Sequence, residues 1–241
     1  MKKLINAALL LGALSFTTTS FAQKGDFTIG ARGGVNISKL CCGSMELNED
    51  YVFGEGPSFG ITASYSFSKY FSLVAELDYA TQGGKRNGMQ AITPGDNNIL
   101  YAKFDNKTVL NYLELPVMAR LTMGDKFKYY VNAGPYIGYL LSAKNVTSGS
   151  SAVYSDKAGT KIEHNGLQSF NSDKDIKDQM QTINFGLCGG IGGGYAFGKH
   201  GIWLDGRYVL GMPNIRKNTA VNGENSTGSI MAGIGYTYTI N

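Results

Sequence analysis

The sequence is poor in the residues that several common protein classes require. Its 241 residues include only 3 cysteines, 5 prolines and 2 histidines. An odd number of cysteines cannot be paired completely in disulfides, and two histidines leave little material for a histidine-based zinc site or catalytic triad. Beyond the first residues, no stretch holds the ~20 apolar residues that a membrane-spanning helix needs. These shortages exclude a disulfide scaffold and a helical membrane protein.

Positive and negative charges are almost balanced in number, and glycine is abundant. The chain has 22 basic and 18 acidic residues, which gives a net charge of +4. This balance leaves no basic footprint of the kind that nucleic acids require, so we expect no nucleic-acid partner. The 33 glycines and 15 tyrosines are typical of a protein with many strands whose backbones approach closely.

The first residues have the pattern of an export signal. Lys2 and Lys3 precede an apolar run of about 13 residues, and Ser20-Phe21-Ala22 matches a small-x-small cleavage site. An uncleaved membrane anchor is the alternative, but the run is shorter than a spanning helix. We therefore predict a signal peptide over residues 1–22, cut after Ala22, followed by one domain over residues 23–241.

The last segment of the chain alternates strictly between apolar and small or polar residues. Successive side chains of a strand point to opposite faces, so this segment has one apolar and one narrow polar face. Its apolar face comprises Ile230, Ala232, Ile234, Tyr236, Tyr238 and Ile240. The pattern predicts a strand that separates two unlike environments.

Seven earlier segments have the same alternation. The eight predicted strands are residues 27–38, 57–67, 70–82, 109–123, 127–142, 182–197, 201–211 and 228–240. Short turns alternate with long connections, which are residues 39–56, 83–108, 143–181 and 212–227. Outer-membrane barrels have short periplasmic turns and long extracellular loops. The sequence therefore predicts an all-β protein, an eight-stranded antiparallel up-and-down transmembrane β-barrel with long extracellular loops.

A soluble barrel with an apolar interior would show the same alternation with opposite polarity. Two features favour lipid contact for the apolar face. The polar face is too small and too poor in lysine to be a solvated exterior, since residues 184–196 present mainly glycine there. Aromatic residues of the apolar face also gather near both strand ends, as in the interfacial girdles of membrane barrels: Phe67, Phe71, Phe127, Tyr129, Tyr195, Phe197 and Tyr238 at the short turns, and Phe59, Tyr79, Tyr139 and Phe185 at the long loops.

Several segments resemble the PorT-like, porin-family outer-membrane barrels, which are relatives of the small OmpA/OmpX-type barrels. They are residues 30–36 (GARGGVN), 112–117 (YLELPV), 132–138 (NAGPYIG) and the closing strand. The resemblance implies an outer-membrane barrel over the mature chain, and it also implies contact with the barrel-assembly machinery. The family name also belongs to a component of a protein-secretion system, so the resemblance suggests a role as an accessory of such a system. The chain departs from the usual assembly signal because it ends in Asn241 rather than phenylalanine.

Two prolines fall inside predicted strands. If the turn at residues 124–126 pairs Met123 with Phe127, Leu115 faces Pro135, and Pro116 lies within about one residue of it across the strands. Proline removes a donor from the ladder. We therefore predict a shared bulge or bend at this level.

Charged residues occupy the polar face in the middle of the strands. Because isolated buried charges are costly, charges that point into a narrow lumen should pair with one another. The predicted structural network comprises Arg32, Glu76, Asp78, Glu114, Arg120, Asp205 and Arg207. A selective channel or proton path along the same residues is the alternative.

The sequence shows no catalytic constellation. His164 lies in the longest loop and His200 in a short turn, so they should lie at opposite ends of the barrel, and neither has a nucleophile beside it on a strand. We expect no catalytic residues, no metal site and no cofactor. Cys41 and Cys42 lie in the first long loop and Cys188 should face the lumen, so a bridge would require the loop to fold inward.

These expectations together predict a non-enzymatic outer-membrane protein with a structural or surface-interaction role. Its predicted partners are outer-membrane lipid and lipopolysaccharide, the assembly machinery, and an extracellular ligand bound through the loops, for which residues 143–181 are the best candidate. A narrow channel for small solutes and a secretion accessory are the alternatives.

Overall fold

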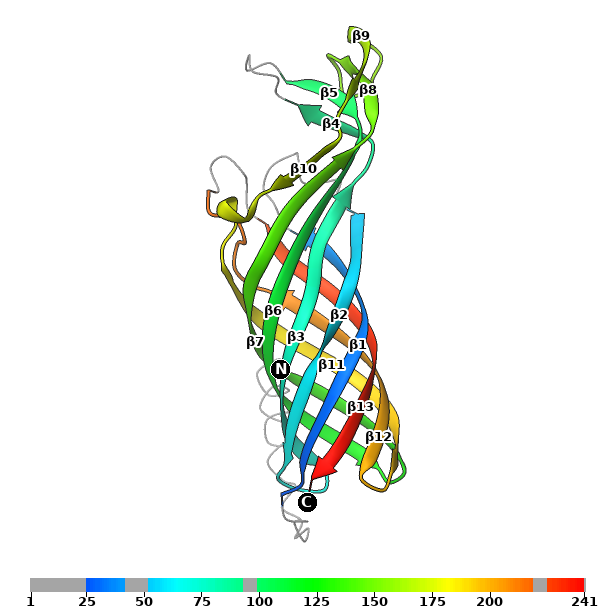
Figure 1. The fold of residues 1–241 in the computed structure, drawn as a ribbon, viewed down its shortest axis with the longest axis vertical. Coiled ribbons are helices and arrows are strands. Elements are labelled where there is room, and N and C mark those ends of the chain that lie inside the picture. Colours follow the sequence, from blue (N-terminus) through cyan, green and yellow to red (C-terminus); the bar gives the residue numbers. More distant parts are fainter. Residues whose placement is uncertain (1–24, 42–51, 93–98, 219–224, 241) are drawn as a thin grey trace, which may run out of the picture.

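A computed structural model describes residues 25–41, 52–92, 99–218 and 225–240 of the chain. In this structure eight antiparallel strands form a closed barrel, which confirms the predicted fold (Figure 1). The barrel strands are β1 (Phe27–Cys41), β2 (Val52–Ser66), β3 (Phe71–Arg86), β6 (Asp105–Gly124), β7 (Phe127–Ser148), β11 (Ile183–Phe197), β12 (His200–Gly211) and β13 (Ser226–Ile240). Each overlaps a predicted strand. The predicted signal peptide, residues 1–22, lies outside the described residues.

The first and last strands close the barrel, as the predicted eight-stranded up-and-down architecture requires. β13 pairs with β1 over the whole length of both, from Phe27 opposite Ile240 to Cys41 opposite Ser226. Each remaining strand pairs with its neighbour in sequence order, and β6 pairs with β7. A closed ladder satisfies the backbone hydrogen bonds of the wall internally, as a span in hydrocarbon requires.

The apolar faces of the strands point outward. Ile61, Ile191 and Leu204 are 61%, 67% and 66% exposed, which excludes the soluble barrel with an apolar interior. Rings contact one another at both ends of this outer surface. Phe127 and Tyr195 lie 4.9 Å apart near the short turns, and Phe59 stacks on Tyr79 at 5.0 Å near the other end.

Large side chains enter the lumen where the neighbouring strand carries glycine at the paired position. Tyr130 of β7 is buried in the lumen, and a Cβ atom at Gly192 would lie 2.3 Å from its ring. A Cβ at Gly194 would similarly lie 2.7 Å from the ring of Trp203. The glycines of β11 therefore make room for aromatic rings. The lumen contains more bulky residues than its glycine-rich sequence pattern suggested.

The two prolines do lie within one residue of each other across the strands, as predicted, but the predicted shared bulge at this level is wrong. Gly124, which has a positive φ of 91°, pairs with Lys128, so the register of β6 and β7 differs from the predicted one and Pro116 faces Tyr136. The register is the same on both sides of the prolines, and only the pairs at residues 117 and 118 are missing. The irregularity of this ladder lies instead at Asn111. Missing donors at the prolines thus interrupt the ladder without shifting it.

Two of the predicted long loops contain strands of their own. β4 (Met89–Ile92), β5 (Leu100–Lys103), β8 (Ser150–Tyr154) and β9 (Ile162–Ser169) form a second, four-stranded sheet. Figure 1 shows this outer sheet beyond the long-loop end of the barrel. β10 (Ser172–Asp175) pairs with the extended end of β7, and η2 (Lys177–Gln179) follows it. Within the described residues, no helix has the length and apolar character that crossing a membrane demands.

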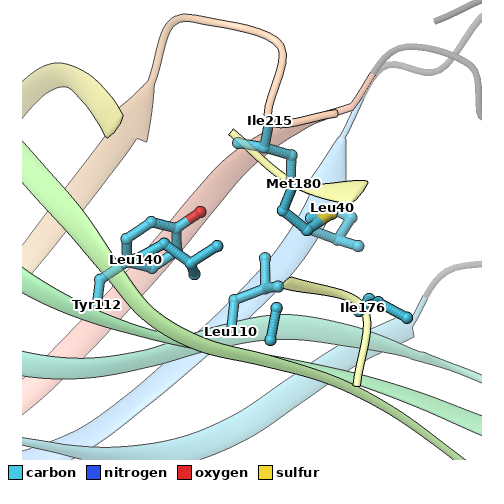
Figure 2. Close-up of a cluster of buried hydrophobic side chains, with 8 residues drawn as sticks. Leu40, Leu110, Tyr112, Leu140, Ile176, Met180 and Ile215 are labelled. Atoms are coloured by element: carbon cyan, nitrogen blue, oxygen red, sulfur yellow. The ribbon is translucent and has the colours of Figure 1, made fainter. Parts of the chain in front are cut away.

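An apolar cluster occupies the lumen at the long-loop end (Figure 2). Inward-facing residues of β1, β6 and β7 contact loop residues that fold in from segments beyond the barrel. The apolar cap comprises Leu40, Leu110, Tyr112, Leu140 and Ala143 from the barrel, and Ile176, Met180 and Ile215 from the loops. Backbone bonds tie these loop segments together, including one from the Gln181 N–H to the Ile215 carbonyl at 2.7 Å. The cap therefore joins parts of two connections inside the barrel mouth.

The cap makes a testable prediction about stability. Leu140 is fully buried in it, whereas the adjacent Leu141 is 39% exposed on the outer wall. We expect Leu140→Ala to lower the free energy of unfolding by about 2–5 kcal/mol, because it leaves a cavity among packed side chains. Urea unfolding of the protein in detergent micelles measures this loss. The control, Leu141→Ala, should change stability much less, and equal losses for both would contradict the assignment.

Candidate functional site

The structure brings the charged residues of the polar faces together in the middle of the lumen. Arg207 of β12 binds Glu76 of β3 through two hydrogen bonds of 2.7 and 3.1 Å. Arg32 of β1 binds Asp78 of β3 in the same two-pronged manner, at 3.1 and 3.0 Å. The planar guanidinium matches a carboxylate in this geometry, which makes such pairs strong. Two bidentate ion pairs thus connect β3 with β1 and with β12 inside the lumen.

Further contacts join these two pairs into one network. Arg32 lies 3.4 Å from Glu76, and Arg207 lies 3.7 Å from Asp78. Asp205 approaches both guanidinium groups, at 3.4 Å from Arg32 and 3.6 Å from Arg207. The carboxylates of Glu76 and Asp78 are almost fully buried. Each buried charge therefore has more than one partner of opposite sign.

The two remaining residues of the predicted set lie at the margins of this network. Arg120 comes within 3.9 Å of Glu76, and its guanidinium lies 4.1 Å from the centre of the Tyr130 ring. Glu114 makes no ion pair with a described residue and accepts a hydrogen bond from Gln82 instead. Sequence reasoning did not identify Gln82 or Tyr130 as partners. Both lie on the polar faces of their strands, and that position was the one signal in the sequence that could have revealed them.

The network fills the lumen at this level. Cavities of about 10 Å³ and 30 Å³ lie beside it, lined in part by Arg32 and by Arg207 or Asp205. A water molecule needs roughly 10–15 Å³ of such volume, so these spaces hold at most a few waters. The apolar cap lies further along the lumen. The barrel is therefore closed by two unlike layers, one of ion pairs and one of apolar side chains.

The other chemically interesting residues lie apart. His164 is in β9 of the outer sheet, and His200 begins β12 at the short-turn end, where its Nδ1 lies 2.5 Å from the Tyr236 hydroxyl. Cys188 is buried in the lumen as a free thiol. The side chains of Cys41 and Cys42 lie outside the described residues. In the described parts of the chain, no group of three or more His, Cys, Asp or Glu could hold a metal ion.

Asp156 organises the hairpin between β8 and β9 in the outer sheet. Its carboxylate accepts hydrogen bonds from the Thr160 N–H at 3.0 Å, from the Thr160 hydroxyl at 2.7 Å and from the Lys161 N–H at 2.7 Å. The bonds from the Lys161 backbone and the Thr160 side chain lower the pKa of Asp156 below its ordinary value. This outer hairpin is thus held in a defined conformation by one carboxylate.

The closed wall, the outward apolar surface and the two bands of rings define an outer-membrane β-barrel protein. A family model described as "Outer membrane protein beta-barrel domain" matches residues 21–217, and the chain belongs to this family. The match ends before β13, although β13 closes the barrel.

Solved structures of other outer-membrane proteins are similar to the chain at low identity. OprG from Pseudomonas aeruginosa shares 14% identity, covers 90% of this chain and 96% of its own, and has a TM-score of 0.42. Ail, the attachment invasion locus protein of Yersinia pestis, shares 13% identity, covers 88% and 98%, and has a TM-score of 0.38. Neisserial surface protein A shares 16% identity, covers 87% and 95%, and has a TM-score of 0.36. A comparison with curated proteins finds none that matches.

Removing one carboxylate from the network tests its contribution to stability. Glu76→Gln keeps the size of the side chain but leaves Arg207 without its closest partner. We expect a loss of about 3–5 kcal/mol, because an uncompensated charge then stays buried. Urea unfolding in micelles measures the loss. The control is Glu163→Gln on the exposed strand β9, which should change stability little, and an unchanged Glu76→Gln would show that the network adds nothing.

The hairpin contact of Asp156 predicts a pH dependence. Because its pKa is lowered in the folded protein, the contact is intact at neutral pH and is lost as the pH falls through that lowered value, below the ordinary 3.8. We expect Asp156→Ala to accelerate hydrogen exchange at Thr160 and Lys161 at neutral pH. After correction for the intrinsic pH dependence of exchange, acid should reduce the protection of these two amides in the unmodified protein and add nothing in the variant. Exchange in the barrel strands serves as the control and should be unaffected.

Proposed function

We propose that the protein is a non-enzymatic outer-membrane barrel that presents its outer sheet to an extracellular partner. The observation that carries the proposal is the outer sheet itself, which joins β4 and β5 from one connection to β8 and β9 from another. Such a sheet requires two connections distant in sequence to adopt one shared structure. Ordered elements of this kind on a rigid scaffold are typical of binding surfaces.

The surface of the outer sheet favours contact with a partner. Every residue of β9 is exposed, and Leu167 in this strand is 81% exposed. Among the strands that the structure describes, β9 pairs only with β8, so no described strand takes up the backbone donors and acceptors of its other edge. Exposed apolar side chains and a free edge are both features that protein partners recognise.

The closed lumen supports this role over that of a channel. Ion pairs and the apolar cap occupy successive levels of the barrel. A channel would need a lumen that is open to water at both of these levels. In this proposal the charge network stabilises the barrel, and the outer wall contacts outer-membrane lipid and lipopolysaccharide. The barrel-assembly machinery inserts the protein into the membrane. No observation favours a secretion accessory.

Site-specific cross-linking on intact cells tests the proposal. A photoreactive amino acid replaces Leu167 on the outer sheet, and the matched control carries it at Leu204, which is 66% exposed on the barrel wall. We expect a discrete protein adduct at residue 167 and none at residue 204, where lipid surrounds the side chain. Asp156→Ala should reduce the yield at residue 167, because it loosens the hairpin that carries β9.

Two results would contradict the proposal. One is the absence of a protein adduct at residue 167 in cells that display the folded barrel. The other is steady conductance of the purified protein in planar bilayers that Glu114→Gln or Arg120→Gln alters, since this would favour the narrow channel.

A further inference from the structure

Besides the charge network and the apolar cap, the lumen has a third region at the short-turn end of the barrel. A cavity of about 140 Å³ lies there, and all eight barrel strands contribute to its wall. Arg120 and Trp203 line it on the side of the charge network, since both also line the small 30 Å³ space beside Asp205. We call this cavity the vestibule. In barrels of this class the short-turn end faces the periplasm, so the vestibule is a blind pocket on that side.

The charges on the wall of the vestibule have one sign. Lys69, Arg120 and Lys128 line it, and among the described residues that form its wall there is no aspartate or glutamate. Lys69 has a partner at the rim, because its Nζ lies 3.5 Å from Asp125. Lys128 has no ion pair with any residue that the structure describes. The vestibule is thus an anion-attracting pocket, whereas the network above it is balanced.

Arg120 has unused hydrogen-bonding capacity. Its guanidinium carries five N–H donors, yet within the described chain it donates no hydrogen bond, and its nearest carboxylate lies at 3.9 Å. Its Nε is buried without an acceptor, and the side chain as a whole is only 15% exposed. Arg32 and Arg207, by contrast, are each bound to carboxylates. The Tyr130 ring covers one face of this guanidinium and Glu76 lies 3.9 Å away, but its N–H donors have no acceptor among the described residues, so an acceptor from outside the chain would complete this site.

Hydroxyl groups surround this guanidinium. Nine serine and threonine side chains line the vestibule. Five of them form no hydrogen bond with another described residue, and these are Thr62, Ser64, Ser66, Ser72 and Thr122. Each free hydroxyl offers a donor and acceptors to a polar molecule in the cavity. The volume of the vestibule is below the ~300–1,000 Å³ of sites for drug-sized ligands, so a small molecule fits best.

We propose that the vestibule is a binding site for a small phosphate ester that carries hydroxyl groups, of the size of glycerol phosphate. The phosphate would take the free donors of Arg120, Lys128 would draw it in from the mouth, and the free hydroxyls would bind the polyol part. Arginine suits this role because its fork of donors matches phosphate oxygens. The site lies at the end of the barrel opposite the outer sheet, so it is independent of the proposed function. The closed lumen above it means that the ligand is held and not passed through.

The chain carries its own reporter for this site. Trp203 is the single tryptophan of the sequence and lines the vestibule. The experiment titrates the full mature protein in nanodiscs of phosphatidylcholine with glycerol 3-phosphate and follows tryptophan emission. We expect a saturable change with glycerol 3-phosphate, a weaker affinity for inorganic phosphate, and no change with glycerol. Nanodiscs that contain phosphatidylglycerol separate two sources of the same chemistry. If the lipid headgroup fills the site, tryptophan emission is already shifted in the phosphatidylglycerol nanodiscs. Glycerol 3-phosphate then causes no further change.

Matched variants separate the site from general effects of charge. Arg120→Gln should weaken binding of glycerol 3-phosphate by about tenfold or more, because it removes the charged donors. Lys128→Gln lies outside the charge network, so it tests the site without disturbing the ion pairs, and it should weaken binding less and reduce its salt dependence. The control, Lys157→Gln in the turn between β8 and β9, should bind like the unmodified protein.

Three results would overturn the proposal. The first is a lack of any saturable change in the millimolar range in both kinds of nanodisc. The second is equal affinity for inorganic phosphate and glycerol 3-phosphate, which would leave the hydroxyl wall without a role. The third is an unchanged affinity for glycerol 3-phosphate in both the Arg120→Gln variant and a folded Lys128→Gln variant.

Discussion

The need to satisfy every backbone hydrogen bond in hydrocarbon is the constraint on which this structure depends. A strand at an open edge would leave its donors and acceptors unpaired among lipid chains. The ladder between β1 and β13 removes both edges, and it runs the full length of each strand. The prolines show how narrow the tolerance is, because Pro116 and Pro135 interrupt pairing locally while the register on either side stays the same.

Closure with eight strands determines what can occupy the interior. A barrel of this size has room for side chains and little else. Large rings such as Tyr130 and Trp203 therefore lie opposite glycines of β11, and charged groups lie within reach of one another. Because Glu76 and Asp78 are almost fully buried in this narrow interior, they require cationic partners. The two ends of the lumen differ. The long-loop end is apolar, and the short-turn end is rich in hydroxyl groups.

Much of this architecture could be predicted, because alternation with a period of two directly reports a wall between two environments. The strand positions, the closing pair and the outward apolar face all followed from that pattern. The polar faces also contained all the residues of the central network. Their pairing could not be predicted, since whether Glu76 meets Arg207 or Arg120 depends on barrel tilt and side-chain reach. The register of β6 and β7 was predicted wrongly because Gly124 pairs with Lys128 and so shifts the turn.

The connections were the least predictable part. Residues 83–108 and 143–181 lack strict alternation, and their pairing into one outer sheet is a contact between distant segments. The apolar cap has the same character, since Ile176, Met180 and Ile215 are single apolar residues in polar surroundings whose burial depends on the barrel mouth beneath them. The sequence by itself determined a membrane wall of eight strands, because local alternation encodes which face each residue takes. Only the tertiary structure decided that the lumen is closed to the outside and open as a pocket at the short-turn end, because that depends on which side chains meet across it.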